Sequence, residues 1–532
     1  MRILKAHWGI LVLLSIAGPL TFLFAVQDCL ATFGDDSASY LVLAHYFAGS
    51  NGSALVAQWA PFHSHFPPLL AMLLAASGGV SDYRVATALI ALSATLCLPL
   101  IYLYASRRLG RAAALAVVAL FVLTPTAWIC VKGILSEPLY LLMTIAALLH
   151  FEARIASGNA GVAERMIFGL LLAGACLTRV IGVTLVAAYL VHSLLSMMMR
   201  REPLRARWVA PLATCAALVG LWYALRPVAI ADTYGRTAFA MATAWAADPL
   251  AMLGHAGRLF AAGWVSTFTA DANVPTTSAF AAAILGLLAL AGVARRLAGN
   301  HIDAWYVVFS LGVILPWVFN VDNTRRLLYP LVPVLLVSAA DFLRWTGERI
   351  GLASRGRAAL FGAAIAMQLA IALPGVALIA GRAQDHTPVV PGLRYTYRDV
   401  TDYYTTIDAG EARKRAMVVV ATLGGLESIA KVAPPAATVM WMRPEYVALL
   451  GQRRAVPFLY RWDARTLARE VARSKTDYVV VTVLLKTDMT GQQGDPGVDT
   501  SAYARPAVVL LEGVFTLMQV DRAALERFLA TP

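Results

Sequence analysis

Eleven long apolar runs determine what this chain can fold into. Each is long enough, or nearly so, to cross the apolar core of a bilayer as a helix. They lie at about residues 8–26, 84–105, 111–130, 136–151, 165–178, 180–199, 208–226, 276–294, 303–319, 327–344 and 358–380. A composition of 59% hydrophobic and 14% charged residues over 532 positions excludes a soluble globular protein. We therefore expect an α-helical polytopic membrane protein with about eleven transmembrane helices.

The net charge of +13 would suit a nucleic-acid binder, so the position of each charge matters. The first apolar run is long and ten more follow it, which predicts an uncleaved helix with a cytoplasmic amino terminus. On that topology 17 of the 44 Lys and Arg residues lie at cytoplasmic ends of spans and 8 at outer ends. This positive-inside pattern accounts for the charge, and no nucleic-acid partner is expected. It places the first loop and the tail on the non-cytoplasmic side of the membrane.

The first outer loop, residues 27–83, contains no Lys or Arg but carries an acidic pair. Asp35 and Asp36 directly precede a helical stripe of apolar residues, and the Gly-Ser-Asn-Gly run at 49–52 predicts its end. The stretch HSHFPPLLAMLLA, residues 63–75, predicts an extended Pro-Pro entry followed by a second short helix. Neither helix is long enough to span a bilayer, so both are expected to lie along the membrane surface.

Isolated charged residues occur at the outer ends of later spans, where they cost free energy unless they face water or a partner. They are Lys132, Glu137 in LSEPLY, Arg179 in LTRVIG, and Arg325 and Arg326 in RRLLYPLVP. For Glu137 the sequence leaves two interpretations open. It either serves a site or simply begins a helix, because an acid and a following Pro both suit a first helical turn.

From about residue 382 the composition becomes that of a soluble domain. Strand-like runs occur at 418–422, 437–442, 477–485 and 507–520, and helical patterns at 444–451 and 463–475. This alternation predicts a small α/β domain. The chain is thus expected to divide into a transmembrane domain at 1–381, which includes the first outer loop, and a periplasmic α/β domain at 382–532.

The order and spacing of these motifs resemble those of the C-type (GT-C) membrane glycosyltransferases, a class that includes protein O-mannosyltransferases and aminoarabinose transferases. The resemblance covers most of the membrane portion and depends on GDDSASYLVLA, FPPLLAMLLA, LSEPLY, LTR before a span, and RRLLYPLVP. The tail segment PEYVALLGQRRAVP is similar to the outer domain of bacterial members, which implies a bacterial inner membrane with a periplasmic tail. The resemblance implies transfer of a sugar from a polyprenyl-phosphate donor to a lipid, glycan or protein acceptor at the outer face of the membrane.

Direct displacement at an anomeric carbon needs one carboxylate to take the acceptor's proton. Asp36 is placed to cap the helix that begins near Ser37, and the helix dipole would then weaken it as a base. Asp35 is therefore the preferred base, as the resemblance also implies, although the choice between the two stays open. The alternative for both acids is a role as caps and solvated loop charges.

A phosphate leaving group needs positive charge more than it needs a proton. Donor phosphate is expected to bind Arg325, Arg326, Lys132 and Arg179, and substrate to contact Tyr40, His63, His65, Glu137 and Tyr329. The alternatives are that the Arg pair anchors to lipid head groups and that the histidines are surface polar residues. No cofactor is indicated with certainty; a divalent cation is compatible with the acidic pair, but no ligand set can be named.

Two other classes of function also require many spans. A transporter or lipid flippase predicts repeated halves and broken helices near the membrane midplane, and the sequence shows neither. A non-enzymatic assembly or receptor protein would keep its function after the first loop is neutralised.

Overall fold

The structure is a computed structural model that describes residues 8–33, 36–156, 160–200, 206–227, 233–271, 274–317, 320–406, 408–458, 462–482 and 500–531. The chain forms two compact units. The first unit comprises Met1–Val26, Ser64–Leu70 and Arg84–Gly381. The second unit comprises Gln27–His63, Ala71–Tyr83 and Arg382–Pro532. Most of the first outer loop therefore belongs to the same compact unit as the tail.

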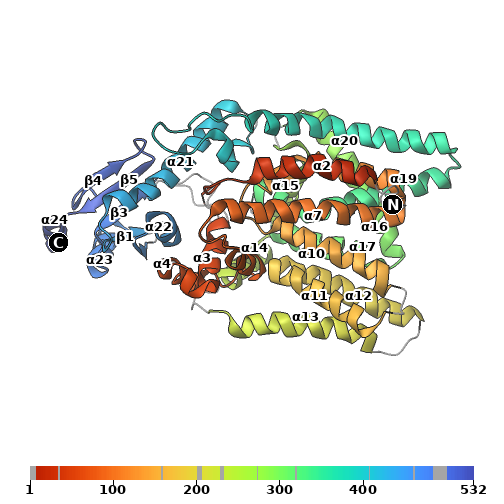
Figure 1. Cartoon of the computed structure of the whole chain (residues 1–532), viewed down its shortest axis with the longest axis horizontal. Coiled ribbons are helices and arrows are strands. Elements are labelled where there is room, and N and C mark those ends of the chain that lie inside the picture. Colours follow the sequence, from red (N-terminus) through yellow and green to blue (C-terminus); the bar gives the residue numbers. More distant parts are fainter. Residues whose placement is uncertain are drawn as a thin grey trace. The chain divides into compact units, whose positions relative to one another are not determined.

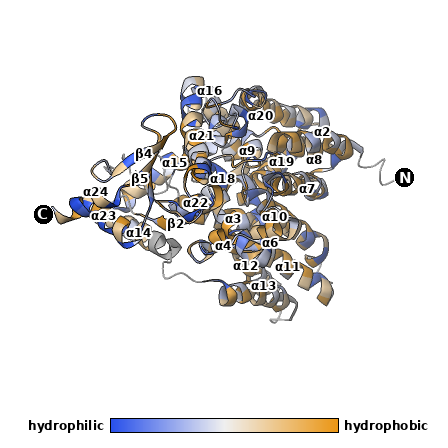
Figure 2. Ribbon diagram, turned by 60° about the vertical axis from the view of Figure 1, so that its left-hand side comes forward, coloured by the Kyte–Doolittle hydropathy of each residue, from blue (hydrophilic) through white to orange (hydrophobic). Residues whose placement is uncertain are grey.

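The first unit is a bundle of long helices (Figure 1). Among the described residues, seven helical segments are long and apolar enough to cross a membrane. They are α2 (Trp8–Ala25), α7 (Tyr83–Leu109), α10 (Glu137–His150) with η2 (Phe151–Ile155), η3 (Val180–Gly182) with α12 (Val183–Arg200), α16 (Thr276–Ala298), α18 (Val321–Leu328) with η5 (Tyr329–Leu331) and α19 (Val332–Arg349), and α20 (Ser354–Arg382). Their hydrophobic residues dominate the bundle in Figure 2.

The remaining expected spans form helices that are not among those seven. They are α8 (Arg111–Val122), α11 (Val162–Thr178), α13 (Ala206–Leu225), and α17 (Ile302–Ile314) with η4 (Leu315–Trp317). The expected total of eleven spans stays a prediction. Between the spans lie α9 (Pro125–Ile129), α14 (Thr233–Ala247) and α15 (Pro249–Thr269).

Small residues allow the bundle helices to approach closely. A Cβ atom at Gly292 would meet the backbone of Ser338, so α16 and α19 touch at that point. Gly169 makes the same kind of contact with the backbone of Pro211, between α11 and α13. Close contacts at small residues are typical of helix packing in membranes, where water supplies no hydrophobic force between helices.

A network of ion pairs joins five of these helical segments, namely α7, α10 with η2, α16, α17 and α19. Asp303, at the start of α17, is fully buried and accepts hydrogen bonds from Tyr104, Arg108 and Arg296. Arg108 also pairs with Glu152, and Asp341 pairs with arginines of α16 and α19. We call the whole set the Asp303 network. Its members are Arg108, Glu152, Arg295, Arg296, Asp303, Asp341 and Arg344.

In the second unit, the helix predicted after the acidic pair is confirmed as α3 (Ser37–Phe47). It ends before η1 (Gly49–Asn51), at the predicted glycine-rich stop, and α4 (Ala54–Ala57), α5 (Ala60–His63) and α6 (Leu69–Ser77) follow. The sequence predicts one apolar stripe, whereas residues 37–44 are all buried. The reason is that α3 packs against α4, α5 and α22. The placement of these helices along the membrane surface stays a prediction.

The tail contains the small α/β domain that the sequence predicts. Its five-stranded sheet has the order β2-β1-β3-β5-β4, with parallel pairing of β2-β1-β3 and antiparallel pairing of β3-β5-β4. The strands are β1 (Thr438–Trp441), β2 (Arg454–Pro457), β3 (Tyr478–Thr482), β4 (Ala504–Val509) and β5 (Phe515–Val520). The helical elements are η6 (Tyr397–Asp399), η7 (Thr401–Tyr403), α21 (Ala409–Val432), α22 (Pro444–Gly451), α23 (Ala464–Arg473) and α24 (Arg522–Ala530).

Two strand predictions need correction, and one strand was not predicted. The run 418–422 is not a strand but the buried centre of α21, because a short apolar run fits a buried helix as well as a strand. The run 507–520 does not form one strand; it includes parts of β4 and β5 and a turn in which Leu511 and Gly513 have positive φ. The sequence analysis missed β2, a four-residue strand at the edge of the sheet.

Candidate active site

A buried carboxylate lies between two arginines at the start of α10. The side chain of Glu137 is 0% exposed, and its Oε1 accepts a hydrogen bond of 2.7 Å from Nε of Arg326. The same oxygen lies 2.9 Å from Nη1 of Arg179, which also donates to Ser136 Oγ at 3.0 Å. Glu137 therefore begins a helix, as one interpretation of the sequence predicts. It also holds two of the expected phosphate-binding residues.

Arg325 lies in the same region and is 2% exposed. Its Nη1 donates to the carbonyl oxygen of Ala270 at 2.8 Å, and its Nη2 donates to Oδ1 of Asp322 at 2.8 Å. Arg325 and Arg326 are consecutive residues of α18, so Arg325 lies beside the arginine that binds Glu137. We call Glu137, Arg179, Arg325 and Arg326 the Glu137 cluster.

The Glu137 cluster is electropositive and incompletely satisfied. It sets three guanidinium groups against one buried carboxylate, since the second acid, Asp322, is 57% exposed. Oε2 of Glu137 and Nε of Arg325 are buried and have no hydrogen-bond partner. Such groups are rare in folded proteins because each loses its water without compensation. Nε of Arg325 is a donor suited to an oxygen of an anion such as a phosphate, whereas Oε2 of Glu137 is an acceptor and does not bind an anion.

Lys132, the fourth expected cation, is held separately. It is 1% exposed, and its Nζ donates to the carbonyl oxygen of Phe24 at 3.0 Å. The ammonium group also lies 4.9 Å from the centre of the Phe24 ring, a favourable cation–π distance. These contacts fix Lys132 against α2, and its contact with donor phosphate stays a prediction.

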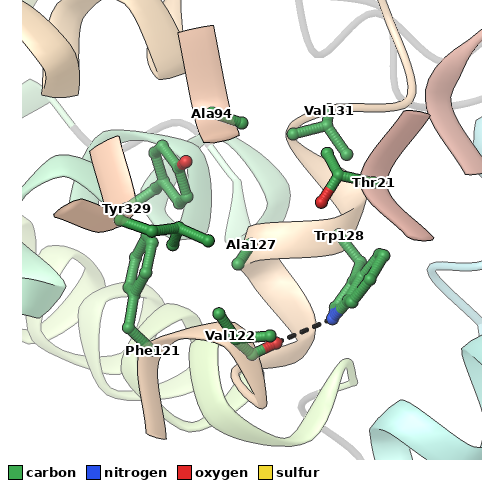
Figure 3. A pocket seen from close by; sticks show the side chains of 9 residues that line it. Thr21, Ala94, Phe121, Val122, Ala127, Trp128, Val131 and Tyr329 are labelled. Atoms are coloured by element: carbon green, nitrogen blue, oxygen red, sulfur yellow. Dashed lines mark hydrogen bonds between the residues drawn. The ribbon is translucent and has the colours of Figure 1, made fainter. Parts of the chain in front are cut away.

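Tyr329 follows the arginine pair and is fully buried. It lines a cavity of about 30 Å³ together with Thr21, Phe121 and Trp128, whose Nε1 donates to the carbonyl oxygen of Val122 at 2.7 Å (Figure 3). The walls are mostly apolar, and the space suits a water molecule rather than a sugar. Tyr329 thus shapes the wall beside the cluster, and its contact with substrate stays a prediction.

The acidic pair belongs to the second unit, and Asp35 lies outside the described residues. Asp36 occupies the N-cap position of α3, as predicted, but the predicted cap bond is absent. Its backbone is already helical, at φ −74° and ψ −9°, whereas a capping side chain requires an extended backbone. Its carbonyl oxygen accepts from the amide of Tyr40, which is itself fully buried in α3.

The two candidate substrate-binding histidines of the first loop belong to different units. His63 ends α5 and is only 8% exposed, which contradicts a surface position. Burial, assisted by the positive charge of Arg443, lowers the pKa of His63 to about 4, so the ring is neutral at pH 7. His65 packs against Phe66, with ring centroids 4.5 Å apart. Contact of either ring with substrate stays a prediction.

The sequence analysis missed the groups that hold the charged residues. Backbone acceptors such as the carbonyls of Phe24 and Ala270 leave no sequence signal. Ser136 could have been noticed, because a Ser before Glu-Pro is a common helix start. Within the described ranges, no three His, Cys, Asp or Glu side chains are grouped so that they could hold a metal ion. A divalent cation therefore stays a prediction.

No family model and no curated protein sequence matches the chain. Solved structures do match it. ArnT from Cupriavidus metallidurans, in a crystal structure bound to undecaprenyl phosphate, superposes with a TM-score of 0.54 at 12% identity, over 97% of this chain and 98% of that chain. The chain has the fold of the GT-C glycosyltransferases. ArnT in the apo state gives a TM-score of 0.52 at 12% identity, over 98% of this chain and 99% of that chain.

A second protein with the GT-C fold also superposes on this chain. The oligosaccharyltransferase of Archaeoglobus fulgidus, tethered with an acceptor peptide containing the NVT sequon, has a TM-score of 0.51 at 12% identity, over 98% of this chain and 75% of that chain. The GT-C fold thus extends over nearly the whole chain, which confirms the fold implied by the sequence motifs.

Proposed function

We propose that this protein is an integral-membrane glycosyltransferase that moves a sugar from a polyprenyl-phosphate-linked donor to a lipid, glycan or protein acceptor at the outer face of the membrane. The observation that carries the proposal is the Glu137 cluster, in which two arginines share one buried carboxylate and a third, buried arginine follows in the same helix as one of them, inside a GT-C fold. The similar ArnT structure is bound to undecaprenyl phosphate, a lipid of the same chemical class as the proposed donor.

In this proposal the Glu137 cluster binds the phosphate of the donor. As the bond between the anomeric carbon and the phosphate oxygen breaks, negative charge builds up on that oxygen, and fixed guanidinium groups stabilise it. Glu137 keeps Arg179 and Arg326 in place by sharing Oε1 between them. Nε of Arg325 is a further buried donor without a protein partner. Lys132 adds positive charge from its position beside α2.

The acceptor is activated by the acidic pair. A carboxylate of Asp35 or Asp36 takes the proton of the attacking acceptor group while the new glycosidic bond forms. Asp36 occupies the N-cap position of α3, directly before the buried part of that helix. Both acids therefore stay candidates, with Asp35 preferred from the sequence. The cytoplasmic amino terminus and the periplasmic tail also belong to the proposal, supported by the distribution of Lys and Arg.

The test begins with the envelope glycolipids and glycoproteins of cells with and without the protein, compared by mass spectrometry to identify the sugar and its acceptor. Transfer from the matching polyprenyl-phosphate sugar is then measured for Asp35→Asn and Asp36→Asn in purified enzyme. Loss of a general base lowers kcat by about 10²–10⁴-fold, so one of the two variants should show that loss.

The matched control is Asp82→Asn, which removes an exposed acid from the same loop and should leave transfer unchanged. Normal transfer by both Asp35→Asn and Asp36→Asn would overturn the proposed mechanism. Movement of the lipid across vesicles without any sugar transfer would support a flippase instead.

A further inference from the structure

We propose that the carboxyl-terminal domain is a positioning element of the active site, which holds the segment before the acidic pair in a clamp of aromatic rings and hydrogen bonds. The proposal rests on the proposed function, because it assigns the clamp to the loop that carries the catalytic acids. All of its contacts lie within the second unit.

The centre of the clamp is Phe33, three residues before Asp36. Its ring centroid lies 5.3 Å from that of Trp441 and 5.0 Å from that of Tyr446. Both partners are fully buried, one at the end of β1 and the other on α22. Trp441 is fixed in turn by a hydrogen bond of 3.2 Å from its Nε1 to Thr482 on β3. Phe33 therefore packs against rings that the sheet itself holds in place.

Three polar contacts hold the residues before Phe33. The hydroxyl group of Thr32 donates to Oδ1 of Asp402 at 2.9 Å, and the amide of Thr401 donates to the carbonyl oxygen of Ala31 at 2.8 Å. Nη1 of Arg394 donates to the carbonyl oxygen of Asp28 at 3.2 Å. These contacts fix the segment before Phe33 at two backbone carbonyl groups and at one side chain.

Glu427 orients the arginine of this clamp. Its Oε1 accepts from Nη2 of Arg394 at 2.6 Å and from the hydroxyl group of Tyr395 at 2.8 Å. The loop residues themselves, Cys29 to Thr32, are all buried. These contacts disfavour the alternative in which the acids are only solvated loop charges, because such a loop would need none of them.

The same domain also holds the chain after the acidic pair, because α22 packs against α3. Asp36 therefore lies between two anchors, Phe33 before it and α3 after it, and both are made with the carboxyl-terminal domain. A catalytic carboxylate has to be fixed to a fraction of an ångström, since a displacement of about 1 Å lowers the rate roughly 10²-fold. The clamp supplies that constraint on a loop that would otherwise be free to move.

The test is Phe33→Ala in the full-length protein. We expect kcat to fall by about 10–100-fold with the donor KM changed less than about twofold, because the phosphate site is untouched and only the acid is displaced. Phe33→Tyr keeps the aromatic packing and should therefore retain most of the wild-type kcat. Thr32→Val, which removes only the hydroxyl group, should lower kcat by a few-fold.

A matched control separates positioning from general damage to the domain. Leu525→Ala truncates a buried residue of α24, which packs on α23. Per folded molecule it should keep the wild-type kcat. Equal losses of kcat per folded molecule in Phe33→Ala and Leu525→Ala would overturn the clamp. If Phe33→Ala does not fold, the kcat values of Phe33→Tyr and Thr32→Val test the clamp instead.

A readout without sugar transfer keeps the two proposals distinguishable. Hydrogen exchange by mass spectrometry should show faster exchange of the α3 amides from Tyr40 to Ala44 in Phe33→Ala but not in Leu525→Ala. Unchanged exchange would contradict the clamp even if the protein is a glycosyltransferase. Faster exchange together with full activity of Asp35→Asn and Asp36→Asn would retain the clamp and reject the proposed mechanism.

Discussion

The first unit contains two fully buried carboxylates, Asp303 and Glu137, that each lie between two arginines but are satisfied to different degrees. Both oxygens of Asp303 accept hydrogen bonds, Oδ1 from Arg296 at 2.9 Å and Oδ2 from Tyr104 at 2.6 Å and from Arg108. Glu137 uses Oε1 for both of its arginines, and its Oε2 has no partner.

The two groups also differ in how deeply their acids are buried. The Asp303 network contains four arginines and three acids, and none of the three acids is more than 19% exposed. The Glu137 cluster contains three arginines, and of their two acid partners only Glu137 is buried, whereas Asp322 is 57% exposed. A buried ion network in which every acid is satisfied holds helices together, whereas arginines that share one oxygen of a single buried acid keep donors for a further anion. In our proposal this difference separates a structural site from a phosphate-binding site.

The largest expected effect comes from breaking the Asp303 network. Asp303→Ala leaves Arg108 and Arg296 buried without their shared anion, which should cost about 3–5 kcal/mol of stability. The thermal midpoint in detergent should fall by several degrees, while transfer per folded molecule at low temperature stays near wild type. A wild-type midpoint would show that the network contributes little. Lost transfer in folded protein would show that Asp303 belongs to the functional site.

A smaller effect comes from pH. The pKa of His63 is about 4 in the folded protein against 6.5 in an unfolded chain, so the unfolded chain binds more protons between these values. Its contribution to stability is therefore complete above pH 6.5 and is lost as the pH falls toward 4. From pH 7 to pH 5 the loss is about 2 kcal/mol. His63→Gln should remove this part of the acid sensitivity in urea unfolding, and an unchanged slope against pH would contradict it.

The titration of His63 also sets the pH at which the stabilities of Asp303 and Glu137 variants should be compared. Stability measurements on Asp303 and Glu137 variants belong above pH 7, where His63 is neutral in the folded and unfolded chains alike. Differences between the variants then report the ion networks and not the histidine.

Local patterns in the sequence predict much of the fold. The helix over Ser37–Phe47 and its stop, the helix α22 and the helix α23 follow from apolar spacing, glycine and capping residues within a few positions. The run 418–422 shows the limit, because whether an apolar segment becomes strand or helix there depends on burial that no neighbouring residue specifies.

The candidate site is less predictable because its contacts join distant positions. The motifs around Glu137, Arg179 and Arg326 are each visible in the sequence, but their meeting at one carboxylate is a result of helix packing. The contact of Phe33 with Trp441 and Tyr446 has no sequence signal at all. Long-range packing thus decides which of several plausible charged residues cooperate.

The most direct test of the account is the binding of undecaprenyl phosphate, compared with undecaprenol, to the purified protein. Wild type should prefer the phosphate, and Arg326→Lys should weaken phosphate binding about tenfold, or about 1.4 kcal/mol, because Lys cannot reproduce the guanidinium geometry. The matched control is Arg295→Lys in the Asp303 network, which should bind the phosphate as wild type does. Equal binding of both lipids by wild type, or equal weakening by both substitutions, would contradict the assignment of the Glu137 cluster as the phosphate site.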